Sequence, residues 1–431
     1  MNRMAVPAIV SMLISAIYNL VDTAFVGKLS TEAVSAVGVA FSFMTLLQAI
    51  SFFFGHGSGN YISRCLGAGN REDAEKMAAT GFFTALGLGI VLMAVTFIFL
   101  NPVMTFLGAK PSFLSETREY MFFILLGTPF IMGSFILNNF MRFQANALMG
   151  MIGIGSGAVL NMVLDPVFIF KLKLGTAGAG LATMLSQTVG FFLLLYLSGR
   201  RNGIRLRISE YNLNTGRIRE ICAGGMPSLL RQGIASAATI CLNRLAGNYG
   251  DSAIAAFSVV NRISMFAGSA VIGFGQGFQP VCGFNYGAGR YDRVKKALVY
   301  SVKVATVYCL VLAVLLYTNA GFVVRRFRKD DAELIRIAES ALKLQALTFP
   351  TVGITVLANM YLQNIRKTVP ASVLALARSG LCFIPTAFLL NGIFGIPGLK
   401  ATQSVADLMA FAISVPLLIL YVRQMMEAYH E

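Results

Sequence analysis

"MAVPAIVSMLISAIYNLVDTAF", residues 4–25, is apolar along almost its whole length, and its only charged side chain is that of Asp22. A hydrocarbon layer about 30 Å thick is crossed by about 20 mainly apolar residues in an α-helix. The run therefore predicts a transmembrane helix. Arg3 precedes it, but no A-x-A-like cleavage site follows, so we expect a retained helix rather than a signal peptide.

Eleven further runs of this kind follow along the 431 residues, and 56% hydrophobic residues with a mean hydropathy of +0.70 exclude an ordinary soluble protein. The runs are too long, and too little alternating, for barrel strands of about 10 residues. The sequence predicts an all-α integral membrane protein with twelve transmembrane helices. The expected spans are residues 4–25, 33–62, 78–100, 119–141, 149–170, 178–198, 223–246, 253–284, 298–319, 337–364, 369–391 and 398–422.

The formal net charge of +16 comes mainly from basic residues in alternate connections between the spans. Basic loops stay on the cytoplasmic side of a membrane. We therefore expect a multi-pass protein of the cell (plasma) membrane with both termini cytoplasmic, although "RRFRKDDAELIR" at 325–336 would then lie outside. The charge indicates contact with anionic headgroups of the lipid bilayer, and no nucleic-acid partner is expected.

An internal repeat divides the chain. A constant shift of about 220 residues places "GKLSTEAVSAVGV" at 27–39 on "GNYGDSAIAAFSV" at 247–259, and "GAGNREDAEK" at 67–76 on "GAGRYDRVKK" at 287–296. Such repeats are typical of transporters built from two halves. Six spans in each half predict two six-helix bundles with a cleft between them, related by a pseudo-two-fold axis along the membrane normal. The expected domains are residues 1–198, a basic cytoplasmic linker at 199–222, and residues 223–431.

Three other patterns have structural interpretations. "GHGSG" at 55–59 and "GFGQG" at 273–277 lie inside apolar helices with no preceding strand, so close helix packing or a bend is expected instead of nucleotide binding. The "GAG" turns at 67 and 287 predict glycine C-caps. The six cysteines form no C-x-x-C pair, so neither a disulfide framework nor a structural metal is expected.

Two acids stand out inside the first half. Asp22 and Asp165 both fall in the outer half of the bilayer, and each shares a helix face with an amide, Asn19 or Asn161. Buried ionisable groups are costly and usually face an interior or a watery cavity. The pattern therefore predicts a site that exchanges H+ or Na+ against another cation. In the alternative interpretation, Asp22 only caps a turn near the interface and Asp165 only closes its helix before Pro166.

The second half differs, because its spans contain basic rather than acidic side chains. The intramembrane arginines are Arg231, Arg244, Arg262 and Arg378. Asp407 is the exceptional acid, and we expect it to pair with one of these arginines rather than to carry ions. The coupling site is therefore predicted in the N-terminal half.

The chain resembles the multidrug and toxic compound extrusion (MATE) family over essentially its whole length. The resemblance is carried by "NLVDTAFVGKLSTEAVSAVG" at 19–38, "LNMVLDPVFIF" at 160–170 with "GTAGAGLATMLSQ" at 175–187, "GFGQGFQPVCGFNYGAG" at 273–289 and "SGLCFIPTAFLLNGIFGIPG" at 379–398. It implies a secondary antiporter that exports cationic, amphipathic drugs. It also implies coupling roles for Asp22, Asn161, Asp165 and Thr183, as in the branch related to DinF and to the exporters of low-GC Gram-positive bacteria.

Several expectations accompany this interpretation. The coupling ion, H+ or Na+, stays open, and a Na+ ion would bind at Asp22 and Asp165; no cofactor is expected. The partners are small-molecule cationic substrates, no drug-contacting residue is assigned, and the protein is expected to act as a monomer. The alternatives are a lipid-linked oligosaccharide flippase that uses the arginines, and a channel. An enzyme is not expected, because only His56 and His430 occur and neither H-E-x-x-H nor G-x-S-x-G is present.

Overall fold

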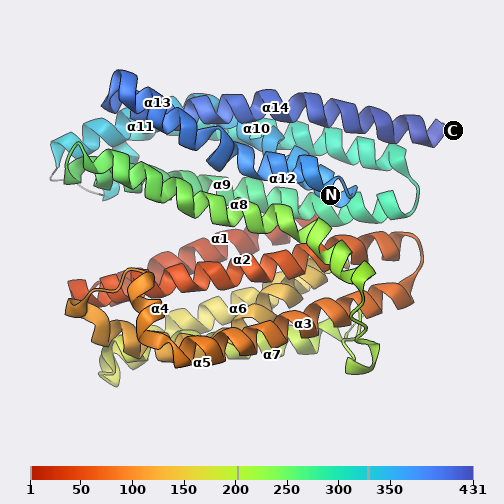
Figure 1. The fold of residues 1–431 in the computed structure, drawn as a ribbon, viewed down its shortest axis with the longest axis horizontal. Helices are drawn as coiled ribbons and strands as arrows, with labels where there is room; N and C mark the ends of the chain where they lie inside the picture. The colour runs from red at the N-terminus through yellow and green to blue at the C-terminus, as the bar shows by residue number, and fades with distance from the viewer. Residues whose placement is uncertain (1, 201–202, 328–330, 431) are drawn as a thin grey trace. The chain divides into compact units, whose positions relative to one another are not determined.

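The computed structural model describes residues 2–200, 203–327 and 331–430, without the side chains of residues 2, 19, 20, 31 and 428–430. All regular secondary structure in these ranges is helical. Eleven long helices and one broken helical span, Thr368–Phe394, form the twelve segments that the hydropathy predicts, and Figure 1 shows their arrangement within each unit. The chain divides into two compact units, Asn2–Gly225 and Met226–Glu431.

The first unit is built around α5, which packs against α2, α3, α6 and α7. The short α4 and η1, between α3 and α5, were not predicted from the sequence. The elements are α1 (Asn2–Val26), α2 (Thr31–Gly67), α3 (Arg71–Ile98), α4 (Leu100–Phe106), η1 (Pro111–Phe113), α5 (Leu114–Phe143), α6 (Ala147–Pro166), η2 (Val167–Lys171), α7 (Gly175–Ser198) and η3 (Ile208–Glu210).

In the second unit the central helix is α11, which packs against α9, α10 and α14. A π-helical turn, η4, interrupts the span between α12 and α13, and a similar turn, η2, follows α6 in the first unit. The elements are α8 (Thr215–Gly247, shared with the first unit), α9 (Asp251–Gly287), α10 (Tyr291–Phe327), α11 (Ala332–Asn364), α12 (Thr368–Leu376), η4 (Ala377–Leu381), α13 (Phe383–Phe394) and α14 (Ile396–His430).

The internal repeat of the sequence is also a repeat of helix boundaries. Both α2 and α9 are 37 residues long, and each ends in a "GAG" turn. The last glycine of each turn, Gly69 or Gly289, has a φ of 78° or 68°, the left-handed region in which glycine is favoured. The predicted glycine caps are therefore confirmed at the same position in both halves.

Eleven of these twelve segments are apolar enough to cross a membrane. The twelfth, α8, is long enough but contains Arg217, Arg219, Glu220, Arg231 and Arg244. Its first residues precede the predicted span, which starts at 223, and they are the most highly charged part of the helix. Low hydropathy along the helix, in which Arg231, Gln232, Asn243 and Arg244 interrupt the apolar residues, rather than insufficient length, thus separates α8 from the other spans.

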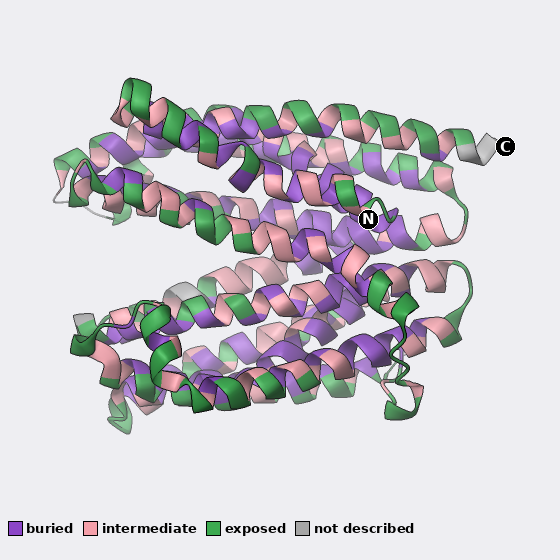
Figure 2. Ribbon diagram, in the orientation of Figure 1, coloured by how far each residue is buried: buried purple, intermediate pink, exposed green. Residues whose placement is uncertain are grey.

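The outer faces of the helices are apolar. On α10, for example, Val307, Leu310, Val311 and Val314 are all exposed and are spaced as one helical stripe. Figure 2 shows exposed residues along the outer sides of the long helices, with buried residues on their inner sides. A soluble protein would not expose such stripes, so these faces are suited to contact with lipid.

The predicted linker is bound to the first unit. Arg71 of α3 donates to the carbonyl oxygen of Gly203 at 2.8 Å, Arg217 pairs with Asp73 at 3.1 Å, and Arg64 pairs with Glu220 at 2.9 Å. Helix α8 begins at Thr215, within the range predicted as linker, and the boundary between the two units falls after Gly225. Ion pairs on α2 and α3 therefore position the start of α8.

The "GHGSG" motif packs closely, as predicted. An added Cβ would lie 2.7 Å from the Asn139 side chain at Gly55, 2.3 Å from the Ile221 carbonyl oxygen at Gly57 and 2.0 Å from the Phe143 ring at Gly59. The absence of side chains here lets α2 approach α5 and the first turns of α8. Small residues allow this kind of contact between membrane helices.

Replacing Gly57 with alanine is expected to destabilise the protein by about 1–3 kcal/mol, the usual cost of overpacking, because the obstructing atom belongs to backbone. Gly38 of the same helix is a matched control, since nothing lies within 4 Å of its added Cβ. Gly38→Ala is expected to raise stability by about 0.5–1 kcal/mol through helix propensity. Thermal unfolding midpoints of the purified variants measure both effects; equal midpoints would contradict this packing.

Candidate functional site

Four of the residues predicted for the coupling site meet inside the first unit. Asp22 comes from α1, Asn161 and Asp165 from α6, and Thr183 from α7. All four are buried, with 6% of Asp22 and none of Asp165 exposed. The Nδ2 group of Asn161 donates to Oδ1 of Asp165 and to Oγ1 of Thr183, both at 3.3 Å. The side chain of Asn19, the fifth predicted residue, lies outside the described part of the chain.

Close packing of three helices brings these residues together. Helix α6 packs against both α1 and α7. An added Cβ at Gly157 of α6 would lie 3.2 Å from the Ser186 carbonyl oxygen of α7, so the two helices approach through a glycine. One turn further along α6, Asn161 reaches Thr183. The helix then ends in the π-helical turn after Pro166, which leaves Asp165 just before the irregular segment.

The two carboxyl groups lie close enough to interact, and Tyr120 of α5 is a further neighbour of Asp22. Three oxygen atoms of the cluster, Oδ1 of Asp22, Oδ2 of Asp165 and Oδ1 of Asn161, are buried and have no hydrogen-bond partner within the described residues. Among those residues, no ion pair includes Asp22 or Asp165. Buried acceptors without partners are costly, and a bound proton or cation would satisfy them.

The chemistry of these side chains indicates which ions fit. Carboxylate, amide and hydroxyl oxygens are ligands for hard cations. Across the described residues there is no group of three or more His, Cys, Asp or Glu side chains that would hold a metal ion. Two carboxylates with one amide oxygen can therefore take up a proton or coordinate a hard cation such as Na+.

Three neighbours of the acids were not found from the sequence. Tyr18 of α1 lies within reach of Thr183 and Gln187, and Tyr120 is buried beside Asp22. Tyr18 precedes Asp22 by four residues, so the helical spacing that selected Asn161 beside Asp165 could have found it. Tyr120 and Gln187 lie on other helices, and only the packing of α5 and α7 brings them to the site.

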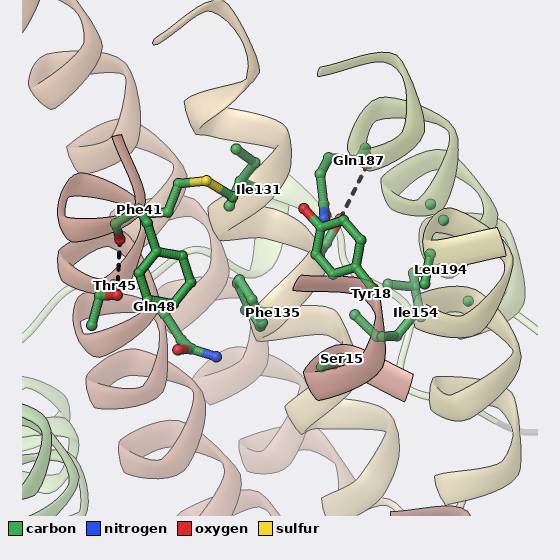
Figure 3. A pocket seen from close by; sticks show the side chains of 16 residues that line it. Ser15, Tyr18, Phe41, Thr45, Gln48, Ile131, Phe135, Ile154, Gln187 and Leu194 are labelled. Carbon is green, nitrogen blue, oxygen red and sulfur yellow. Dashed lines mark hydrogen bonds between the residues drawn. The ribbon is translucent and has the colours of Figure 1, made fainter. Parts of the chain in front are cut away.

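A cavity with a volume of about 70 Å³ lies next to this cluster in the first unit. Its walls come from α1, α2, α5, α6 and α7, and the polar residues on them are Ser15, Tyr18, Thr45, Gln48, Ser134 and Gln187. Figure 3 shows Tyr18 and Gln187 side by side on one wall, across from Phe41. Because Tyr18 touches both the cavity and the acid cluster, it links the two.

The second unit contains the predicted acid–arginine pair. Nε of Arg378, in the π-helical turn η4, lies 2.8 Å from Oδ1 of Asp407 on α14. Gln403 donates to the same oxygen at 2.9 Å. Of the other intramembrane arginines, Arg231 is half-buried, whereas Arg244 and Arg262 are exposed. Asp407 is therefore engaged by an arginine, in contrast to Asp22 and Asp165.

Comparisons with known proteins agree with this organisation. A family model described as MatE matches residues 7–167 and again residues 227–389, so the two matches start at Pro7 and Pro227, which the repeat superimposes. The multidrug export proteins MepA of Staphylococcus haemolyticus and Staphylococcus aureus (strain N315) are 27% and 28% identical, over 94% of this chain and 90% of theirs.

Solved structures share the fold. A crystal structure of a MATE protein in complex with MaL6, and an outward-facing multidrug resistance MATE transporter of the MOP superfamily, each match with a TM-score of 0.93 at 23% identity, over 99% of this chain and 96% of theirs. At this identity the likeness establishes the two-bundle, twelve-helix architecture. The two family matches together cover well over half of the sequence. The chain therefore belongs to the MatE family.

Proposed function

We propose that this protein is a secondary antiporter that exports cationic, amphipathic compounds in exchange for H+ or Na+ by alternating access. The observation that carries the proposal is the pair of buried carboxyl groups, Asp22 and Asp165, whose free oxygen atoms have no partner within the described residues. The MepA relatives are named multidrug export proteins, which supports the substrate class.

The cluster can alternate between two charge states. With a proton or Na+ bound, the carboxyl oxygens are satisfied and repulsion between the two acids is relieved. Without it, two negative charges lie in a site of low dielectric and attract a cationic substrate. The adjacent cavity, with aromatic and amide side chains around Tyr18, supplies a surface on which such a substrate can lie. Binding of the coupling ion and binding of the substrate are then mutually exclusive.

The ion gradient and the membrane potential supply enough free energy for export. One pH unit supplies about 1.4 kcal/mol per proton, and 100 mV supplies about 2.3 kcal/mol per charge. One or two ions can therefore move a substrate uphill by a few orders of magnitude. In this proposal the protein acts as a monomer in the cell membrane. Both termini are cytoplasmic, because the basic loops favour that orientation.

A flippase for lipid-linked oligosaccharides needs a cationic cleft for the pyrophosphate. Two observations favour the exporter instead: Arg378 is engaged by Asp407, and the buried carboxyl oxygens of Asp22 and Asp165 without partners suit a cationic rather than an anionic substrate. The discriminating experiment reconstitutes the protein in liposomes and follows export of an ethidium-like dye under a pH gradient alone and under a Na+ gradient alone. Acceleration by one gradient supports antiport and identifies the ion; equal rates with and without both gradients would refute it.

Replacing Thr183 with valine is expected to slow dye export by roughly fivefold, the equivalent of about 1 kcal/mol for one hydrogen bond. The change keeps the shape of the side chain but removes the acceptor for Asn161 Nδ2. Thr188→Val on the same helix is the control, because that hydroxyl donates only within its own helix, to the Met184 carbonyl oxygen at 2.8 Å. Initial export rates at matched protein amounts measure the difference, and a Thr183→Val rate equal to that of the control would count against this role.

A further inference from the structure

A second cavity, of about 40 Å³, lies wholly within the second unit. One water molecule needs roughly 10–15 Å³ of such a volume and fills about 30 Å³ of liquid, so the space corresponds to about three water molecules, which is the size of a small organic molecule. Its apolar walls include Leu242 of α8, Phe257 and Val260 of α9, and Phe383 of α13. Four polar side chains complete the lining: Asn261, Gln345, Lys400 and Gln403.

Gln345 of α11 supplies hydrogen-bond donors to this cavity. The residue is 6% exposed, and its Oε1 accepts a hydrogen bond from Ser264 at 2.7 Å. The carbonyl side of the amide is thereby engaged, whereas its NH2 group forms no hydrogen bond with the described residues. A nearly buried amide that lines a cavity with its donors unused indicates a ligand with acceptor atoms.

The charge at the cavity is positive. Lys400 of α14 is half-buried, and among the described residues it takes part in no ion pair. Arg336 of α11 is close enough to add to the positive field. The nearby acid Asp407 is engaged by Arg378 and Gln403, and Glu339 by Lys343 at 2.7 Å. A half-buried ammonium group with no carboxylate partner favours an anion in the adjoining space.

We propose that this cavity binds a carboxylate group carried on a small apolar body, such as an aryl carboxylate. Lys400 pairs with the carboxylate, the amide of Gln345 donates to it, and Phe257 and Phe383 contact the apolar body. A single lysine with one amide matches one negative charge, and the small volume excludes a bulky headgroup. The ligand class is opposite in charge to the proposed export substrates, and the site shares no residue with the acid cluster.

The test uses the full-length protein in detergent and two fluorinated probes of nearly equal shape, 4-fluorobenzoate and the neutral 4-fluorobenzamide, followed by 19F NMR line broadening. The benzoate is expected to bind at least tenfold more tightly than the benzamide. Equal binding of the two probes to the unaltered protein would overturn the proposal without any variant. An equal response after heat denaturation would show only non-specific adsorption and would overturn it as well.

Variants of the protein then test which side chains bind the benzoate. Lys400→Met and Gln345→Glu are each expected to weaken benzoate binding at least tenfold, the second because a built-in carboxylate takes the ammonium group. Lys400→Arg is expected to retain binding within about threefold. Lys303→Met, at an exposed lysine of α10, is the matched control. Unchanged benzoate binding by the Lys400→Met variant would refute the site. Benzoate binding that is retained by the Asp165→Asn variant would show that this site is independent of the proposed antiport.

Discussion

Asp165→Asn is expected to abolish gradient-driven dye export while the protein remains inserted and folded. The replacement keeps the size and the hydrogen-bonding capacity of the side chain, including an acceptor for Asn161, but it removes the negative charge and the ability to take up a proton. Asp165 is fully buried in the cluster and Asp22 is its close acidic neighbour, so the remaining carboxyl group would act alone. We expect Asp22→Asn to have the same effect.

The controls separate coupling from folding. Asp292→Asn makes the same chemical change at an exposed position in the first turn of α10 and should export dye at the unaltered rate. Asp165→Glu keeps the charge and is expected to restore part of the activity. Each variant must elute as a single species with an unchanged unfolding midpoint. Full export by the double variant Asp22→Asn with Asp165→Asn would remove the cluster from the mechanism.

Much of the fold was predictable because the membrane imposes length and hydropathy on every span. The boundary of α9 follows that of α2 because the repeat preserves the "GAG" turn and its left-handed glycine, Gly289. Asp22 and Asp165 could be selected because a carboxylate in an apolar run is conspicuous. Placing them in one cluster needed only equal depth and the resemblance to a family.

What could not be predicted depends on contacts between helices. No pattern in the sequence distinguishes Tyr120 or Gln187 from other residues of their helices. Only the packing of α5 and α7 brings them towards Asp22 and Tyr18. The bound linker is another example, since Arg217 pairs with Asp73 across more than a hundred residues of sequence. Hydropathy also does not show which arginine faces Asp407, because that depends on the π-helical turn that carries Arg378.

Arg378→Met is expected to destabilise the protein by about 3–5 kcal/mol, because it leaves Asp407 charged and buried with only Gln403 as a donor. The side chain of Asp407 is 1% exposed and that of Arg378 is 31% exposed. The reverse change, Asp407→Leu, should therefore cost less, since water reaches the remaining guanidinium group. The double variant, which removes both charges, is expected to return close to the unaltered stability. Unfolding midpoints of the four proteins measure this cycle.

The same double variant tests whether Asp407 acts in transport. An acid whose charge is already balanced by an arginine has little capacity to exchange a proton or Na+, so export should persist when the pair is replaced by apolar side chains. The expected pattern is thus a stable double variant with dye export within about threefold of the unaltered rate. A double variant that is as unstable as Arg378→Met would contradict the pairing. A stable one that no longer exports dye would place Asp407 among the coupling residues and extend the ion site to the second unit.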